Sequence, residues 1–189
     1  MTDFIRTRLN LSLRFKFMRE LETERLRLRY IDKNDAAKIF YGWANDPEVT
    51  EYLTWDCHKD ILDTNFVLAI WIEEYKSENC FRWGIERKED GALIGMIDVV
   101  RFDGKENGVP VIGYCSGKKY WGNGYMTEAC KAVVGELFEC GYPTILISAA
   151  AENIGSNRVI QKCGFRFVES RQEVLKNKTL TVNHYRIDK

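Results

Sequence analysis

The sequence has no long apolar run, and its charges show no excess of either sign. Its longest apolar stretches, such as residues 66–72 and 144–151, are far shorter than the roughly 20 residues that a membrane-spanning helix needs. Its 28 basic side chains equal its 28 acidic ones, whereas dedicated nucleic-acid-binding proteins normally carry a basic excess on one face. We therefore expect no membrane partner and no nucleic-acid partner.

Sequence patterns typical of metal-binding sites are also absent. The six cysteines include no C-x-x-C pair, and neither His58 nor His184 stands in a cluster of other ligand residues. This spacing predicts no metal site. Because the sequence shows no secretory signal and is rich in core-forming residues, we expect reduced, mostly buried thiols and a cytoplasmic location.

The length of 189 residues fits one ordinary domain, and no low-complexity linker interrupts it. The core-like pattern begins near Met18. We expect residues 1–17 to be an N-terminal extension without a catalytic role and residues 18–189 to form a single domain. A transit peptide or a membrane-surface helix is the alternative for the extension, although it lacks a continuous apolar region.

Hydrophobic periodicity predicts a mixture of strands and helices. Residues 25–31 alternate with period two, as in a half-buried strand, whereas residues 36–43 show helical spacing that Asp46-Pro47 ends. Together with the elements given in the next sentence, this order predicts a mixed α/β domain with one strand–helix–strand crossover in its second half. The remaining predicted elements are a helix over 59–76, strands over 81–87, 92–101 and 109–116, a helix over 126–140, a strand over 144–151, a helix over 156–163, and strands over 165–175 and 179–187.

The segment 119–125, Lys-Tyr-Trp-Gly-Asn-Gly-Tyr, joins a predicted strand to an amphipathic helix. Gly122 and Gly124 permit positive φ and close backbone approach. Because the first amides of a helix have no intrahelical acceptor, this turn predicts a site for an anion such as a pyrophosphate. A turn without a ligand is the alternative, since G-x-G alone is weak and the nucleotide-hydrolase and dinucleotide patterns are missing.

The wider sequence around this turn resembles the GNAT superfamily of N-acetyltransferases. The stretch 112–129 is similar to its motif A, [Q/R]-x-x-G-x-[G/A], with Lys119 in the leading basic position. Further along, the run 153–157, Asn-x-x-Ser-Asn, and the Gly-Phe that follows it resemble a second marker of the superfamily. These two motifs and the segment 21–26, Leu-Glu-Thr-Glu-Arg-Leu, are typical of the branch that includes ribosomal-protein N-terminal acetyltransferases.

The resemblance implies a GNAT-like α/β fold of the mixed α+β kind, with a central, mostly antiparallel sheet of about seven strands and about four flanking helices. In this fold the strand before motif A and the strand after it splay apart, and acyl-CoA inserts its pantetheine arm into the gap. Residues 111–116 and 144–151 occupy these two positions. The implied co-substrate is acetyl-CoA (coenzyme A), without a metal.

By position, the resemblance assigns acyl-CoA binding to motif A and to the second marker. Main-chain amides of residues 119–127 would hold the pyrophosphate, while Asn153 and Asn157 would contact the pantetheine or order the neighbouring loop. Each asparagine could instead cap the short helix. The predicted cofactor-binding residues are Tyr114, Cys115, Ser116, Lys119, Tyr120, Trp121, Gly122, Asn123, Gly124, Tyr125, Met126, Thr127, Asn153 and Asn157.

Two residues are predicted to take part in catalysis. Ser156 is the candidate for the group that faces the departing thiolate, as in related enzymes, with a plain helix cap as the alternative. Many relatives carry a glutamate just before Ile-Gly-Tyr, where this chain has Val111, so Asp98 is the best remaining acid to take a proton from the amine. By strand alternation Asp98 could instead face solvent, and bulk water would then accept the proton.

The expected activity is transfer of an acetyl group to a primary amine, either a protein N-terminus or a small molecule, by direct attack in a ternary complex. Trp55 and His184 are the predicted acceptor-binding residues, with a core position as the alternative for each. A longer acyl group is a second option. A non-catalytic acyl-CoA-binding protein is an alternative that Val111 favours. A homodimer is compatible with the resemblance, because dimers are common in the family.

Overall fold

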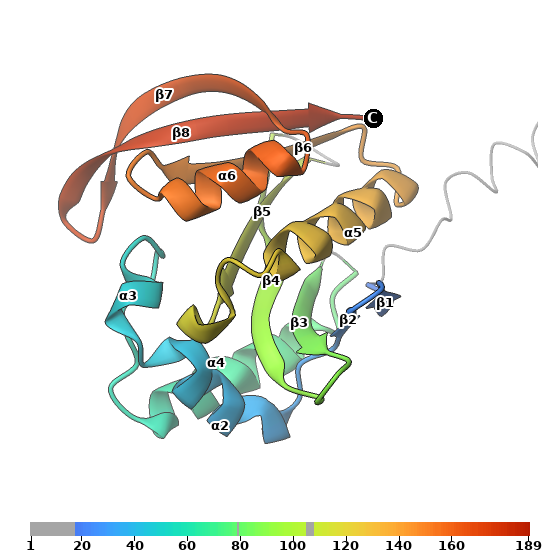
Figure 1. Ribbon diagram of the computed structural model, residues 1–189, viewed down its shortest axis with the longest axis vertical. Helices are drawn as coiled ribbons and strands as arrows, with labels where there is room; N and C mark the ends of the chain where they lie inside the picture. The colour runs from blue at the N-terminus through green and yellow to red at the C-terminus, as the bar shows by residue number, and fades with distance from the viewer. Residues whose placement is uncertain (1–17, 79, 105–107) are drawn as a thin grey trace, which may run out of the picture.

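The computed structural model describes residues 18–78, 80–104 and 108–189. The prediction for residues 1–17 therefore lies outside the described residues. Within the described part of the chain, eight strands form one sheet in the order β1-β2-β3-β4-β5-β6-β8-β7 (Figure 1). Every neighbouring pair is antiparallel except β5 and β6, which confirms the predicted mixed, mostly antiparallel sheet.

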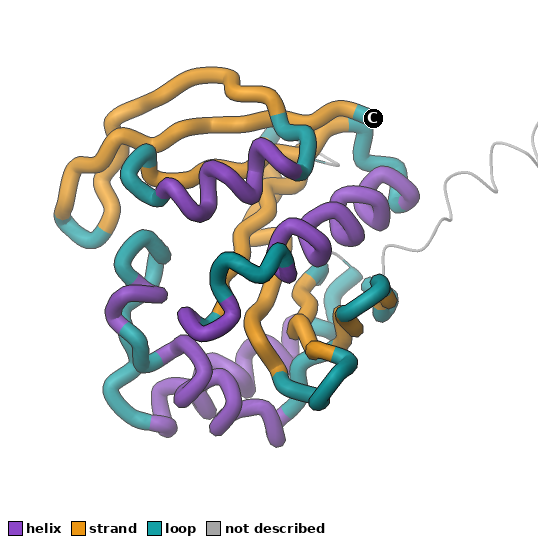
Figure 2. The backbone as a smooth tube through the Cα atoms, viewed as in Figure 1, coloured by secondary structure: helices purple, strands orange, loops and turns teal. Residues whose placement is uncertain are grey.

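The predicted elements occur in the predicted order with small shifts at their ends, and the structure adds short elements that were not predicted, among them β1 and α3 (Figure 2). The strands are β1 (Leu21–Glu22), β2 (Leu26–Arg29), β3 (Arg82–Arg87), β4 (Leu93–Asp103), β5 (Val109–Ser116), β6 (Thr144–Ala150), β7 (Arg166–Leu175) and β8 (Lys178–Asp188). The helical elements are η1 (Lys33–Asp35), α2 (Ala36–Ile39), η2 (Phe40–Ala44), α3 (Pro47–Thr50), α4 (Ile61–Glu74), η3 (Lys118–Tyr120), α5 (Tyr125–Glu139) and α6 (Ile154–Lys162).

Local sequence explains where the first helices begin and end. Asp60 and Asp63 form a capping box at the start of α4, which satisfies amides that the helix itself cannot pair. Asp46 caps α3, and Pro47 takes the first helical position, where its missing N–H does no harm. Asp46-Pro47 thus ends the preceding helix, as predicted, and starts a new one. The preceding helix differs from the prediction, because it is divided into the 3₁₀ turn η1, α2 and the π-helical η2.

The two faces of the sheet carry separate hydrophobic cores. α5 and α6 lie over one face, where Trp83, Ile112 and Leu137 belong to the larger buried cluster (Figure 1). A smaller cluster around Trp43 joins α2, η2 and α4 to the other face. The neighbours Tyr114 and Cys115 pack against different clusters, because successive side chains of a strand point to opposite faces. β5 therefore connects both layers.

The strands β5 and β6 pair at their first halves and then separate. Their register joins Val111 to Leu146 and Ile112 to Ile147, and no further pair follows within these two fully described strands. Beyond that point the backbone of β5 loses its neighbour on this side. The structure thus contains the splayed pair of parallel strands that the resemblance implied, and the gap between them positions the site.

Candidate active site

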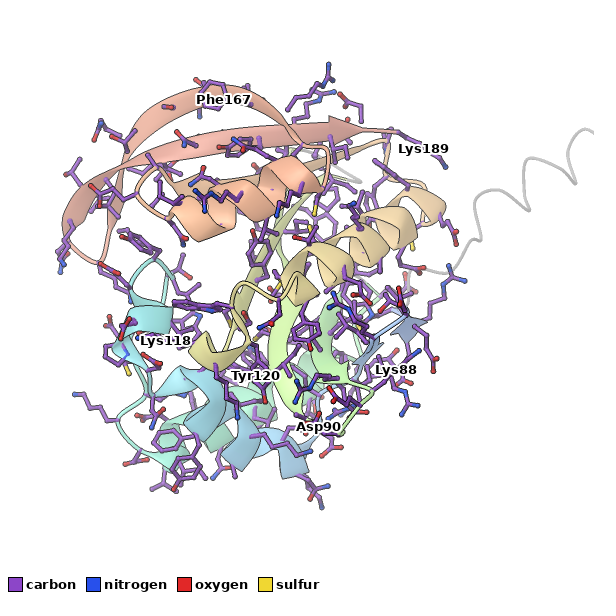
Figure 3. The ribbon with its side chains drawn as sticks, viewed as in Figure 1. Lys88, Asp90, Lys118, Tyr120, Phe167 and Lys189 are labelled. Carbon is purple, nitrogen blue, oxygen red and sulfur yellow. The ribbon has the colours of Figure 1, made fainter. Side chains whose placement is uncertain are left out.

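A cleft of about 580 Å³ opens where β5 and β6 separate. Its walls are the second half of β5, the loop into α5, the first turns of α5 and α6, and the α3 region. A volume of this size is typical of sites for small molecules and cofactors. Lys118 and Tyr120 mark the loop between β5 and α5 in Figure 3.

Most of the predicted cofactor-binding residues line this cleft, and Lys119, Asn123 and Asn157 do not. The Lys119 ammonium lies 4.9 Å from the centroid of the Tyr120 ring. The Asn123 side-chain amide donates to the carbonyl oxygens of Tyr120 (3.2 Å) and Trp121 (3.0 Å), so it holds the loop in shape. Contacts of all these residues with coenzyme A stay predictions.

The helix α5 begins without a side-chain cap. Its N-cap is Gly124 in the left-handed region (φ 80°), and Gly122 also has positive φ (76°). The first helical hydrogen bond runs from the Glu128 amide to the Gly124 carbonyl (3.0 Å), so the amides of the preceding turn have no helical acceptor. Gly124, Tyr125, Met126 and Thr127 all line the cleft. A bound anion can therefore meet open amides and the positive end of the helix dipole.

A side-chain network that sequence analysis did not foresee braces this turn from behind. The Arg25 guanidinium donates to Glu128 Oε2 (2.7 Å) and to the Asn123 carbonyl (3.1 Å), and it lies 4.6 Å from the Tyr125 ring centroid. Thr23 Oγ1 donates to Glu128 Oε1 (2.6 Å). The segment 21–26, Leu-Glu-Thr-Glu-Arg-Leu, thus has a structural role, because it attaches the glycine turn to the corner between β1 and β2.

The helix α6 begins with a side-chain cap. Asn153 Oδ1 accepts the amide of Ser156 (3.0 Å), so Asn153 is the cap that sequence analysis offered as its alternative role. Ser156 lies in the first turn and is not the cap, and α6 begins at Ile154, earlier than predicted. Asn157 is buried and donates to the carbonyl of Ala150 at the end of β6 (2.8 Å). These bonds attach the first turn of α6 to the sheet.

Ser156 meets Tyr114 across the gap between the splayed strands. The two hydroxyl oxygens are 3.0 Å apart, and the Tyr114 hydroxyl is 3.2 Å from the Ser156 carbonyl oxygen. Both residues line the cleft. Burial raises the pKa of Tyr114 well above its ordinary value, so the phenol keeps its proton at neutral pH.

Asp98 lies outside the set of residues that line the cleft. Its carboxylate forms an ion pair with Arg82 (3.3 Å), which also contacts Glu74 (2.7 Å). Burial raises the pKa of Asp98 to about 6, even though the charge of Arg82 opposes the shift. Asp98 is thus neither solvent-facing nor in the cleft, and its role as a base stays a prediction that this geometry does not favour.

The predicted acceptor-binding residues Trp55 and His184 also lie outside the cleft lining. Trp55 packs against the smaller core with its ring 5.3 Å from that of His58. His184 on β8 places Nε2 2.8 Å from Glu173 of β7. On this side the cleft is lined by residues of α3 and of the segment that follows it, which includes Tyr52 and Leu53. Only the aromatic character of Tyr52 could have signalled this from the sequence.

Two further features of the cleft were missed. The basic residues Arg158 and Lys162 of α6 line it, and their spacing of four residues from each other and from Ile154 places all three on one helix face. The acidic residues Glu51 and Glu152 line it next to Tyr52, whose pKa is raised by partial burial and by these two negative charges. The cleft therefore has both basic and acidic lining residues.

Neither a metal cluster nor a membrane span is present in the described part of the chain. No group of three or more histidine, cysteine or acidic residues gathers with the spacing of metal ligands among residues 18–78, 80–104 and 108–189. Within the same residues, no helix combines the length and apolarity needed to cross a bilayer. The six cysteines are free thiols, three of them buried.

The family of this chain follows from its similarity to known proteins. A sequence profile described as the acetyltransferase (GNAT) domain matches residues 25–166, which is more than half of the chain. The chain belongs to the GNAT acetyltransferases. An uncharacterized N-acetyltransferase of Bacillus subtilis (strain 168), YoaA, is 34% identical over 147 residues, covering 77% of this chain and 82% of YoaA. The protein is thus an N-acetyltransferase that depends on an acyl-CoA.

Two solved structures share the fold of this GNAT protein at lower identity. The microcin C7 self immunity acetyltransferase MccE, solved with acetyl-CoA and AMP, has a TM-score of 0.77 at 20% identity, covering 88% of this chain and 93% of MccE. A putative ribosomal-protein-serine acetyltransferase from Vibrio cholerae has a TM-score of 0.75 at 18% identity, covering 90% of this chain and 98% of that one. These likenesses confirm the GNAT fold that the motifs predicted.

Proposed function

We propose that this GNAT protein transfers an acetyl group from acetyl-CoA to a primary amine by direct attack within a ternary complex. The observation that carries the proposal is the convergence of three features on one cleft: the unpaired edge of β5, the open amides at the start of α5, and Ser156. The first can pair with the pantetheine arm, the second can hold the diphosphate, and the third can face the thioester sulfur.

The residues of the cleft supply what acyl transfer needs. An amine must lose its proton before it attacks, and the tetrahedral intermediate needs a hydrogen-bond donor at its oxyanion. A backbone N–H of the splayed half of β5 is the proposed donor, since β6 does not pair there. Because Asp98 is held by Arg82, we propose that water takes the amine proton.

The acceptor is proposed to enter on the side of Tyr52. Glu51 and Glu152 beside this residue favour a positively charged molecule, and a primary amine is cationic before it reacts. The name of the Vibrio cholerae neighbour refers to a ribosomal-protein serine, which supports a protein N-terminus as one acceptor class. Small amines are the other class.

The test is an assay of free thiol released from acetyl-CoA in the presence of N-terminal peptides, polyamines and amino acids. We expect release with at least one acceptor class and formation of an acetylated product by mass spectrometry. The alternative is an acyl-CoA-binding protein without turnover. It is favoured by Val111, which is buried in β5 where many relatives carry a glutamate. This alternative predicts that acetyl-CoA binds, but that no acceptor accelerates thiol release.

A further inference from the structure

The contact between Tyr114 and Ser156 is more specific than a shared position in the wall of the cleft. The phenol oxygen lies 3.0 Å from Ser156 Oγ and 3.2 Å from the Ser156 carbonyl oxygen. The residues are 42 positions apart and come from β5 and α6, which stand on opposite sides of the gap. Two hydroxyl groups that meet in this way constrain each other's hydrogens.

The backbone of Ser156 has little freedom to adjust. Its amide donates to Asn153 Oδ1 (3.0 Å), and the next residue, Asn157, is tied to the Ala150 carbonyl of β6 (2.8 Å). The Asn157 side-chain oxygen also accepts from the Tyr185 hydroxyl of β8 (2.6 Å). With this backbone held and Oγ in contact with the Tyr114 hydroxyl, the variable left at Ser156 is the direction of its own O–H bond.

The direction of that bond depends on which of two acceptors takes the Tyr114 proton. Burial keeps the Tyr114 phenol protonated, so it has one proton to donate, and both acceptors in reach belong to Ser156. If Tyr114 donates to Ser156 Oγ, the Ser156 proton is left to point into the cleft. If Tyr114 donates to the Ser156 carbonyl instead, the Ser156 proton faces the phenol oxygen; the shorter distance to Oγ, 3.0 Å against 3.2 Å, favours the first arrangement.

We propose that Tyr114 is a positioning residue for Ser156: it donates to Ser156 Oγ and thereby aims the Ser156 proton at the sulfur atom of bound coenzyme A. This inference rests on the proposed function. During transfer the amine lone pair forms the N–C bond, and the electron pair of the C–S bond leaves on sulfur. Ser156 then donates a hydrogen bond to the thiolate. Tyr114 keeps its proton throughout, and the proton released by the amine goes to water.

The first experiment measures the pKa of the thiol of coenzyme A bound to the full chain, from the ultraviolet absorbance of the thiolate. We expect binding to lower this pKa, because Ser156 stabilises the anion. Tyr114→Phe and Ser156→Ala should each raise it again by about one unit, the effect of one lost hydrogen bond. The double variant should show no further rise. Tyr142→Phe, which packs against Phe81 away from the cleft, is the matched control.

The second experiment compares steady-state kinetics. Tyr114→Phe should lower kcat about tenfold with KM for acetyl-CoA changed less than about twofold, and its effect should vanish in the Ser156→Ala background. The inference would be overturned if bound coenzyme A had the same thiol pKa in Tyr114→Phe as in wild type, or if the two substitutions lowered kcat by factors that multiply in the double variant. Either result would leave the proposed function intact. A wild-type protein that binds no coenzyme A would overturn the proposed function and this inference together.

Discussion

The helices α5 and α6 both begin at the wall of one cleft, but their first turns are built differently. α5 follows Gly124, which offers no side-chain cap and leaves the first amides open. α6 follows Asn153, whose side chain takes the amide of Ser156. An open helix start suits a ligand that brings its own negative charge, whereas a capped start suits a side chain that must be held in place. The two halves of the proposed reaction, binding and chemistry, are thus assigned to different helix starts.

The largest expected effect comes from placing a negative charge at the open helix start. Gly122→Glu should weaken coenzyme A binding by more than about 100-fold, because a carboxylate would face the diphosphate at short range. Isothermal titration calorimetry on the folded variant measures this. Gly141→Glu is a matched control at the other end of α5, since Gly141 also has positive φ (93°) and open space at its β-carbon. Equal weakening by both variants would show that backbone strain, not charge, is responsible.

A smaller effect, on rate alone, is expected at the capped helix start. Ser156→Ala should lower kcat about 100-fold, the usual loss on removing one donor to developing negative charge, while the Kd for coenzyme A stays within about twofold. Stopped-flow thiol release and calorimetry separate the two quantities. A parallel loss of affinity and rate would place Ser156 in binding and would remove the distinction between the helix starts.

The cap itself is expected to contribute modestly. Asn153→Ala should lower the free energy of unfolding by about 1 kcal/mol, because the Ser156 amide loses its acceptor, and should reduce kcat more than it changes KM. Asn153→Asp retains a capping oxygen and is the matched control, measured by urea denaturation. If Asn153→Ala were as stable and as active as wild type, the cap would not position Ser156.

The smallest effect on activity is expected at Asp98, which pairs with Arg82 and lies outside the cleft that the first turns of α5 and α6 line. Asp98→Asn should leave kcat within about twofold at neutral pH, because Asp98 is outside the cleft lining. Folded Asp98 has a pKa of about 6 and keeps its proton where the unfolded chain, at 3.8, has lost it. Wild-type stability relative to Asp98→Asn should therefore fall as pH rises from 3.8 to about 6.

Urea denaturation of both proteins across this pH range measures that difference. A constant difference would show that Asp98 titrates normally in the folded state. A large loss of kcat in Asp98→Asn, with the loss following a group of pKa near 6, would instead restore Asp98 as the base. Either outcome decides between a carboxylate and water as the acceptor of the amine proton.

Much of the fold and of the coenzyme A half of the site follows from sequence patterns. β5 spans Val109–Ser116, the predicted bounds, and α5 begins one residue before the predicted start. Each of these features is local: the apolar strand, the glycine turn and the amphipathic helix can each be predicted from a short window of the sequence. The positive φ of Gly122 and Gly124 is likewise a local property that a G-x-G turn makes available.

The acceptor half was predicted less well, because it depends on which side chains face one space. Trp55 and Tyr52 are three positions apart in one connecting segment, and the sequence gives no reason why Tyr52 lines the cleft while Trp55 packs on the core. Asp98 could not be placed either. Its partner Arg82 lies on the neighbouring strand β3, and the register of the two strands decides their contact.

The sequence by itself determined the family, the order of the elements and the open start of α5, since these depend on neighbours along the chain. The tertiary structure decided that Ser156 faces Tyr114, that Arg25 braces the glycine turn through Glu128, and that Asp98 is held by Arg82. Each of these contacts joins residues from different elements. Their geometry exists only once the sheet and its two helical layers have packed, because packing fixes distances that sequence separation leaves free.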